Sequence, residues 1–263
     1  MTRSEPLVEC HDLSLYFGGL KAIDAVNFTL DAGELRCLIG PNGAGKTTFF
    51  RLLTGVHRPT AGTIRVLGQS ISGMQTHQIA ALGVGIKTQV PSLYENLTVR
   101  ENIWLSARRH HPRREADRIA DCVLEEDIAL SDLEGCQVAQ LAHGQRPWVE
   151  LGVVIAQGPE LILLDEPAAG MTGTEIERTA ELIRHINRKA ALIVVEQDMD
   201  FIRRIAKTVT VFDQVRVLIE AGVDVVVANE RVRDVYLGKQ RVRPHEAGTE
   251  FNLCGLRQHP DPS

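Results

Sequence analysis

Apolar and polar residues alternate along the first part of the chain. Between residues 7 and 30 the alternation runs on both sides of a Gly-Gly pair at residues 18–19, and residues 64–67 form a further short apolar segment between glycines. A period of two with a glycine turn is typical of antiparallel strands. The sequence therefore predicts an antiparallel β-layer near the N-terminus.

Three largely apolar segments further along the chain predict buried strands. They cover residues 35–39, 161–164 and 191–195, and a charged stretch with helical spacing at residues 174–189 separates the last two. Strand, helix and strand in that order are typical of a parallel sheet with both faces covered. We therefore expect an α/β fold with a three-layer core.

The middle and the end of the chain have different patterns. From residue 98 to about residue 130, apolar residues recur at helical spacing among many charged ones, which predicts a helical subdomain. Beyond residue 240 the chain is polar and has no periodicity, so we expect residues 241–263 to form a disordered tail.

Composition indicates a globular protein. The 263 residues are 44% hydrophobic and 24% charged, which is enough for one large or two small domains. The longest apolar runs are far shorter than the roughly 20 residues that cross a bilayer, and the N-terminus has no signal-peptide pattern. We therefore expect any membrane association to go through a partner.

Cysteine and charge distribution exclude other classes. The five cysteines are scattered without a C-x-x-C spacing, so neither a disulfide framework nor a zinc site is predicted, and a reducing cytoplasm is the natural compartment. The net charge of −5 argues against a nucleic-acid partner. The one basic stretch, residues 108–114, is interpreted as a solvated helix end or loop.

Residues 40–47 carry the most specific motif, because Gly-Pro-Asn-Gly-Ala-Gly-Lys-Thr matches the phosphate-loop pattern G-x-x-x-x-G-K-[ST] between a predicted strand and a predicted helix. Glycines let consecutive N–H groups point at an anion, Lys46 supplies a positive charge, and the Thr47 hydroxyl can bind Mg²⁺. An ordinary glycine-rich turn is the competing interpretation. The predicted ligand is a nucleoside triphosphate with magnesium. The candidate binding residues of this loop are Gly40, Asn42, Gly43, Ala44, Gly45, Lys46, Thr47 and Thr48.

A second motif places two carboxylates at the end of an apolar strand. Asp165 and Glu166 follow residues 161–164, where open α/β sheets bind ligands. Magnesium needs a carboxylate and the attacking water needs a base, so Asp165 is predicted to serve the metal and Glu166 to be the base. The alternative is an acidic pair that caps the following helix.

The order of these motifs resembles that in the ATPase subunit of ATP-binding cassette transporters, from residue 7 to about residue 239. Five more motifs fall in the family's order. They are Phe17 at the adenine position, Gln89 in the glutamine loop, Leu-Ala-His-Gly-Gln at residues 141–145 as the signature, residues 169–172 after the catalytic glutamate, and Gln197 at the switch position.

The resemblance implies a P-loop NTPase of the cassette type, with a RecA-like three-layer core, an antiparallel β-subdomain and a helical subdomain. We expect the cassette to span residues 1–240 and its helical subdomain to span about residues 90–157. Strand alternation lets only one of Tyr16 and Phe17 face the nucleotide, so Phe17 is expected on adenine and Tyr16 inside the β-layer.

The resemblance also implies a two-chain machine that closes head to tail around two ATP molecules. The signature residues Ala142, His143, Gly144 and Gln145 would contact the triphosphate held by a second cassette, identical or different. Gln89 would contact both the metal and the water, beside Thr47 and Asp165 as metal residues. Pro147 fits the first turn of the helix after the signature.

Two integral membrane permease subunits and, indirectly, a periplasmic solute-binding protein are the further partners that the resemblance implies. The chain would then lie peripherally on the cytoplasmic face of the bacterial inner membrane. Residues 90–96 resemble the family surface that receives a helix of the permease. The sequences of the signature and of residues 166–172 are most similar to those of cassettes that power uptake of urea or short-chain amides. Importers of branched-chain amino acids are the alternative.

Three positions depart from the family pattern. Gln197 replaces the usual switch histidine and cannot become cationic, so we expect a slow site rather than an inactive one. Ala142 and His143 replace a serine and a glycine of the signature, and His143 either contacts phosphate or is a bystander. Val215 stands where relatives place a hairpin glycine, which disfavours a left-handed turn there.

Competing functions remain at this point. A regulatory or scaffold subunit that binds ATP with little turnover is consistent with Gln197 and Ala142, although Glu166 argues against it. A soluble cassette in DNA repair or translation would carry tandem cassettes or a long coiled coil, and no sustained heptad run appears. A small-molecule kinase has no use for a signature motif.

Overall fold

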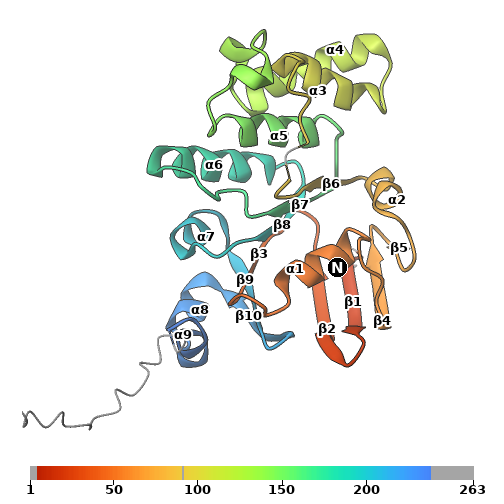
Figure 1. Cartoon of the computed structure of the whole chain (residues 1–263), viewed down its shortest axis with the longest axis vertical. Coiled ribbons are helices and arrows are strands. Elements are labelled where there is room, and N and C mark those ends of the chain that lie inside the picture. The colour runs from red at the N-terminus through yellow and green to blue at the C-terminus, as the bar shows by residue number, and fades with distance from the viewer. Residues whose placement is uncertain (1–4, 91, 238–263) are drawn as a thin grey trace, which may run out of the picture.

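The computed structural model describes residues 5–90 and 92–237. The tail predicted for residues 241–263 lies outside the described residues. Figure 1 shows an elongated arrangement in which a helical part lies at one end, a central sheet follows, and an antiparallel sheet lies beside it.

Six strands of the described part form the central sheet, in the order β10-β9-β3-β8-β7-β6. All neighbouring strands are parallel except β10, which pairs antiparallel with β9. The predicted strand-helix-strand unit is confirmed by the parallel pairing of β7 with β8. The bounds are β3 Leu35–Ile39, β6 Val84–Lys87, β7 Leu161–Asp165, β8 Ala191–Val195, β9 Thr208–Asp213 and β10 Arg216–Gly222.

Both faces of this sheet are covered, which explains why β7 and β8 are almost entirely apolar. Ile162 and Leu164 of β7 pack on one face with α6 (Gly173–Ile186) and α7 (Met199–Ile205), in a cluster that also includes α5 (Arg146–Ile155). Leu161 and Leu163 point to the other face and pack with α1 (Lys46–Leu53) and the antiparallel strands. The alternation of side chains along each strand therefore separates the molecule into three layers.

Four strands of the described part form the antiparallel sheet, in the order β2-β1-β4-β5. Its first two strands turn at residues 18–19, as predicted. Register shifts interrupt the pairing of β1 with β2 at several points, so strict alternation fails at the end of β1. The bounds are β1 Val8–Phe17, β2 Leu20–Leu30, β4 Ala61–Val66 and β5 Gln69–Ser70, followed by helix α2 Thr76–Ala81.

The helical part forms the far end of the molecule in Figure 1. It packs onto the sheet through α5, whose Trp148 donates its indole N–H to Thr179 of α6 at 2.9 Å. The basic residues 108–114 lie mostly exposed between two of its helices, as predicted. Its elements are α3 Val99–Arg108, α4 Arg113–Cys122, a π-helical turn Val123–Asp127, two 3₁₀ turns at Ser131–Leu133 and Val138–Gln140, and α5; α8 Val223–Ala228 and α9 Glu230–Leu237 close the described chain beside β10.

The hairpin between β9 and β10 braces the loop that precedes α1. Gln214 and Val215 both have left-handed backbone, with φ of 44° and 63°. The Val215 N–H donates to the Ala44 carbonyl at 3.1 Å, the Asp24 N–H donates to the Val215 carbonyl at 2.9 Å, and Arg216 pairs with the Asp24 carboxylate at 2.5 Å. Val215 thus adopts the left-handed turn that a valine was expected to disfavour, and contacts on both sides hold this turn in place.

Val215 is strained in this left-handed conformation, since its Cβ crowds the backbone at a cost of about 1–2 kcal/mol. We expect Val215→Gly to raise the thermal midpoint by about 2–4 °C. Val215→Ala keeps the Cβ and is the matched control, with no comparable rise expected. Calorimetry of the three proteins checks this, and an equal rise in both variants would show that backbone strain is not the cause.

Candidate active site

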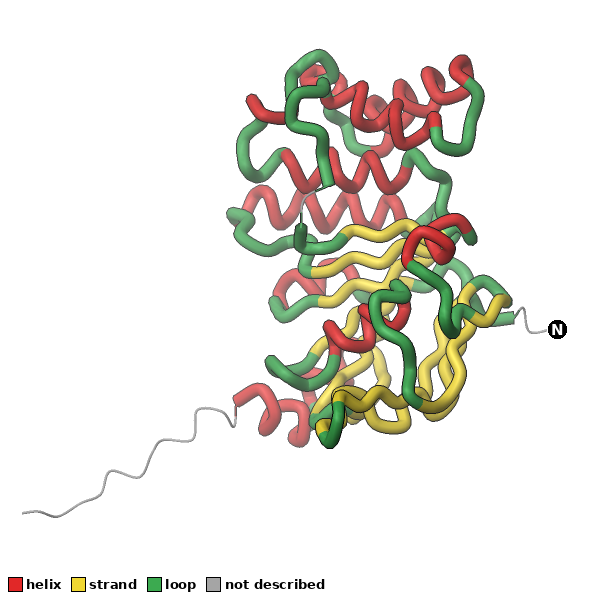
Figure 2. Tube along the Cα trace, turned by 45° about the vertical axis from the view of Figure 1, so that its right-hand side comes forward, coloured by secondary structure: helices red, strands yellow, loops and turns green. Residues whose placement is uncertain are grey.

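Three strand ends bring the predicted functional residues to one edge of the central sheet. β3 leads into the loop of residues 40–45, β7 ends at Asp165 and is followed by Glu166, and β8 is followed by Glu196 and Gln197. β8 lies between β3 and β7 and is parallel to both. The carboxyl ends of all three strands therefore lie side by side, where open α/β sheets bind their ligands. Figure 2 shows these strands from the side.

The loop before α1 has the backbone of an anion site. Gly40 has φ of 146°, and a Cβ added there would lie 2.2 Å from the carbonyl oxygen of Phe212, so only glycine fits. Gly45 has φ of 106° and is the N-cap of α1. No side chain caps this helix and no acidic residue lies in its first turn. The N-terminal N–H groups and the helix dipole therefore favour a negatively charged ligand here.

Lys46 lies inside this loop. Its side chain is buried, and its ammonium donates to the carbonyl oxygens of Gly40 at 2.5 Å and Pro41 at 3.2 Å. The other predicted loop residues differ in exposure: Asn42, Gly43 and Thr47 are exposed, Thr48 is half-buried and Ala44 is buried.

Asp165 has a carboxylate oxygen that accepts no hydrogen bond from the described residues. Its Oδ1 is buried and has no hydrogen-bond partner among the described residues. Burial raises the pKa of this carboxyl and the neighbouring Glu166 raises it further, while Arg51, Lys87 and Lys46 act in the opposite direction. A buried carboxylate oxygen without a partner is costly unless a ligand uses it, and a hard cation is the ligand that this oxygen suits.

Glu166 is held by two amides. Gln89 donates from Nε2 to Glu166 Oε2 at 2.9 Å, and Gln197 donates from Nε2 to Glu166 Oε1 at 2.7 Å. Glu166 also has left-handed backbone, with φ of 47°, of the kind that clusters at functional sites. The structure thus brings the three predicted catalytic residues together, and in this structure Gln197 contacts the carboxylate.

The signature residues form the turn that starts α5. Gln145 is the N-cap residue of this helix, and its Oε1 accepts the N–H of Ala142 at 3.0 Å. Pro147 lies in the first turn of α5, as predicted. A proline there costs no helical hydrogen bond, because the first N–H groups of a helix have no partner within it.

The same turn packs against the start of α6. A Cβ added to Gly144 would lie 1.6 Å from Glu175 Oε1, so the carboxylate occupies the space that any side chain would need. Hydrogen bonds from Thr172 lower the pKa of Glu175, and the nearby His143 lowers it slightly further. His143 therefore lies beside an acidic side chain of its own chain.

The signature turn and the phosphate loop lie on opposite faces of the central sheet. α5 packs in the cluster that contains α6 and α7, whereas α1 packs in the cluster that contains the antiparallel sheet. Figure 1 shows α5 and α1 separated by the strands between them. One chain therefore does not bring its own signature to its own phosphate loop.

The aromatic residues at the end of β1 differ in part from expectation. Phe17 is 50% exposed, and its ring meets the edge of His57 at a centroid distance of 5.3 Å. Tyr16 is also exposed, at 36%, and its hydroxyl reaches Asp24 Oδ1 at 3.5 Å. The expectation that Tyr16 packs inside the β-layer is wrong, because its side chain is exposed at the end of β1, where a register shift follows Leu15.

Glu196 is a site residue that the sequence interpretation did not select. It follows β8 directly and is 5% exposed. The same rule that selected Asp165 and Glu166, an acidic residue at the carboxyl end of a buried strand, applies to it equally. Its neighbour Gln197 drew attention only because the family pattern has histidine there.

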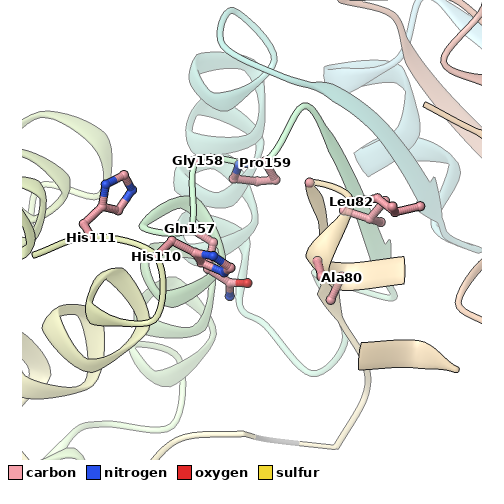
Figure 3. A pocket seen from close by; sticks show the side chains of 10 residues that line it. Ala80, Leu82, His110, His111, Gln157, Gly158 and Pro159 are labelled. Carbon is pink, nitrogen blue, oxygen red and sulfur yellow. The ribbon is translucent and has the colours of Figure 1, made fainter. Parts of the chain in front are cut away.

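A cavity of about 340 Å³ lies away from these residues. Figure 3 shows its lining, which comes from α2, from the turn after α3 with His110 and His111, and from residues 157–159. Within the described part of the chain, no group of three or more His, Cys, Asp or Glu residues could hold a metal ion.

A glycine-rich phosphate loop that leads into a helix, together with an acidic pair at the end of a nearby parallel strand, defines a P-loop NTPase. The family profile described as ABC transporter matches residues 23–169. The chain belongs to the ABC transporter family and is an ATPase subunit whose ATP hydrolysis is coupled to transport. In residues 5–90 and 92–237, every helix is too short or too polar to cross a bilayer.

Two relatives match over nearly their whole length. The chain is 32% identical to the high-affinity branched-chain amino acid transport ATP-binding protein BraF of Pseudomonas aeruginosa, over 90% of this chain and 99% of the relative. It is 32% identical to the protein LivG of Escherichia coli, which carries the same description, with the same coverage.

Solved structures confirm the predicted fold class. An ATP-binding cassette of an ABC transporter in its ADP conformation superposes with a TM-score of 0.79 at 20% identity, covering 89% of this chain and 100% of the other. The cbiO1 protein of Clostridium perfringens gives 0.79 at 23% identity, covering 90% and 97%. These likenesses establish the fold alone.

Proposed function

We propose that this chain is the ATPase subunit of an importer for branched-chain amino acids. Relatives from Pseudomonas aeruginosa and Escherichia coli carry that solute in their names, and this chain covers 99% of each. Urea or short-chain amides were the first expectation from the motif sequences, but neither of these two relatives has such a solute in its name. The relatives therefore favour the alternative that the sequence left open.

Within this function, the loop from Gly40 to Thr48 holds the phosphates of ATP. Support comes from the uncapped N-terminus of α1 and from the buried ammonium of Lys46, which can exchange loop carbonyls for phosphate oxygens. Phe17 stacks on adenine, since its ring is half exposed at the end of β1.

Magnesium fits the same edge of the sheet. Thr47, Asp165 and Gln89 would hold it, directly or through water, and the orphaned Oδ1 of Asp165 is the observation that supports this. A site with one carboxylate suits Mg²⁺, which takes its remaining ligands from phosphates and water. When bound, the ion neutralises phosphate charge.

Glu166 is the general base in this proposal. Both its oxygens accept hydrogen bonds from side-chain amides. Gln89 and Gln197 therefore orient the carboxylate. Gln197 cannot become cationic as the usual switch histidine can, which supports slow turnover at this site.

A second cassette completes the site. Ala142, His143, Gly144 and Gln145 lie on the face of the sheet away from their own phosphate loop, which supports head-to-tail pairing with an identical or different cassette around two ATP molecules. In that arrangement the start of α5 points its N–H groups at the partner's nucleotide.

The membrane partners are two permease subunits, with a periplasmic binding protein beyond them, and the chain is peripheral on the cytoplasmic face of the bacterial inner membrane. Val90 and Tyr94, which follow Gln89, are 74% and 61% exposed. Apolar side chains this exposed next to the site support docking of a permease helix there.

The solute is tested with the complete transporter in liposomes. We expect binding protein loaded with leucine to stimulate ATP hydrolysis and uptake, and urea to have no effect. The Glu166→Gln transporter should retain ATP binding and lose stimulated hydrolysis. Stimulation by urea and not by leucine would overturn the proposed solute while leaving the ATPase assignment intact.

The amide at position 197 is tested by restoring a titratable group. A charge-assisted hydrogen bond to phosphate contributes about 1.5–3 kcal/mol, which is roughly ten- to a hundredfold in rate. We expect Gln197→His to raise the steady-state ATPase rate of the assembled transporter, with the larger gain below about pH 6.5, where imidazole is cationic. Gln197→Asn is the control without a titratable group. An unchanged rate in the histidine variant would contradict the proposed role.

A further inference from the structure

Glu196 is a buried carboxylate that joins two loops of the active site. Its Oε1 accepts the backbone N–H of Ala168 at 3.3 Å, in the loop that follows Glu166. Its Oε2 accepts the backbone N–H groups of Gln197 at 2.7 Å and Asp198 at 3.4 Å, in the loop that follows β8. Each oxygen therefore serves a different loop.

Burial makes this arrangement costly. Removing the carboxylate from water raises the pKa of Glu196, the three backbone N–H groups lower it, and the nearby negative charge of Glu166 raises it again. A buried acidic side chain beside a second carboxylate destabilises a fold unless its contacts offset the desolvation. The desolvation of Glu196 is therefore an energetic cost within the active site.

The two loops that Glu196 joins carry the two ends of one catalytic contact. Gln197, which follows β8, donates its side-chain amide to Glu166, which follows the neighbouring strand β7. The position of the Gln197 amide depends on the backbone of residues 197–198, and the position of Glu166 depends on the turn through Ala168. Glu196 is bonded to both backbones, and its main chain also ties β8 to β3, because the Glu196 N–H donates to the Leu38 carbonyl at 3.2 Å.

We propose that Glu196 is a positioning residue for hydrolysis, which fixes the loop after Glu166 and the loop of Gln197 relative to each other. This inference rests on the proposed role of Glu166 as base. It requires an ionised carboxylate, because only a group with two acceptor oxygens can serve N–H donors on both sides.

The substitution Glu196→Gln separates positioning from stability. Glutamine has nearly the same shape but one acceptor oxygen, so its NH₂ group faces an N–H on one of the two loops. We expect kcat for ATP in the assembled transporter to fall about tenfold, because an unpaired donor shifts one loop, with KM for ATP within about twofold. The thermal midpoint should stay the same or rise, since a buried charge is removed.

Glu196→Asp is the matched variant, because it keeps both acceptor oxygens on a shorter arm. We expect its kcat to lie between those of the wild type and Glu196→Gln. An unchanged kcat in Glu196→Gln would overturn the proposal. A fall in kcat that accompanies a fall in the thermal midpoint, equal in both variants, would also overturn it and leave Glu196 a purely structural residue.

Glu166→Gln in the same transporter distinguishes this inference from the function on which it rests. If Glu166→Gln abolishes turnover and Glu196→Gln changes nothing, the positioning role fails and the assignment of the base stands. If Glu166→Gln retains turnover, the assignment of the base fails first.

Discussion

The parallel register of β3, β8 and β7 is the constraint on which the rest of the site depends. Leu38 pairs with Val195, and Val195 pairs with Asp165, so the three strands end at one level. The phosphate loop, the acidic pair and the loop of Gln197 after β8 meet there because backbone pairing fixes them. A slip of one residue in β7 would turn Asp165 to the other face of the sheet.

The same sheet supports the proposed pairing of two cassettes. Helices on one face include α5, which starts at the signature, while α1 and its phosphate loop lie on the other. Because the central sheet lies between them, the signature and the phosphate loop of one chain do not meet. The layering of the fold therefore supports the proposed pairing, in which each cassette supplies its signature to the phosphate loop of the other.

Much of this could be predicted from the sequence, because local patterns carry it. The phosphate loop, the apolar runs of the parallel strands and the turn with Pro147 all depend on neighbouring residues. The exposure of Tyr16, the left-handed Val215 and the bonds of Gln89 and Gln197 to Glu166 could not be predicted. Each depends on contacts between segments far apart in sequence, such as the 2.9 Å contact between Gln89 and Glu166.

The whole mechanism requires that the edge formed by β3, β8 and β7 binds the triphosphate of ATP. Titration calorimetry of the purified chain with ATP and magnesium tests this most directly. We expect saturable binding to the wild type and a loss of at least about tenfold in affinity for Lys46→Ala, since a charge-assisted contact to phosphate is removed. Absence of binding by the wild type, or equal affinity in the variant, would contradict it.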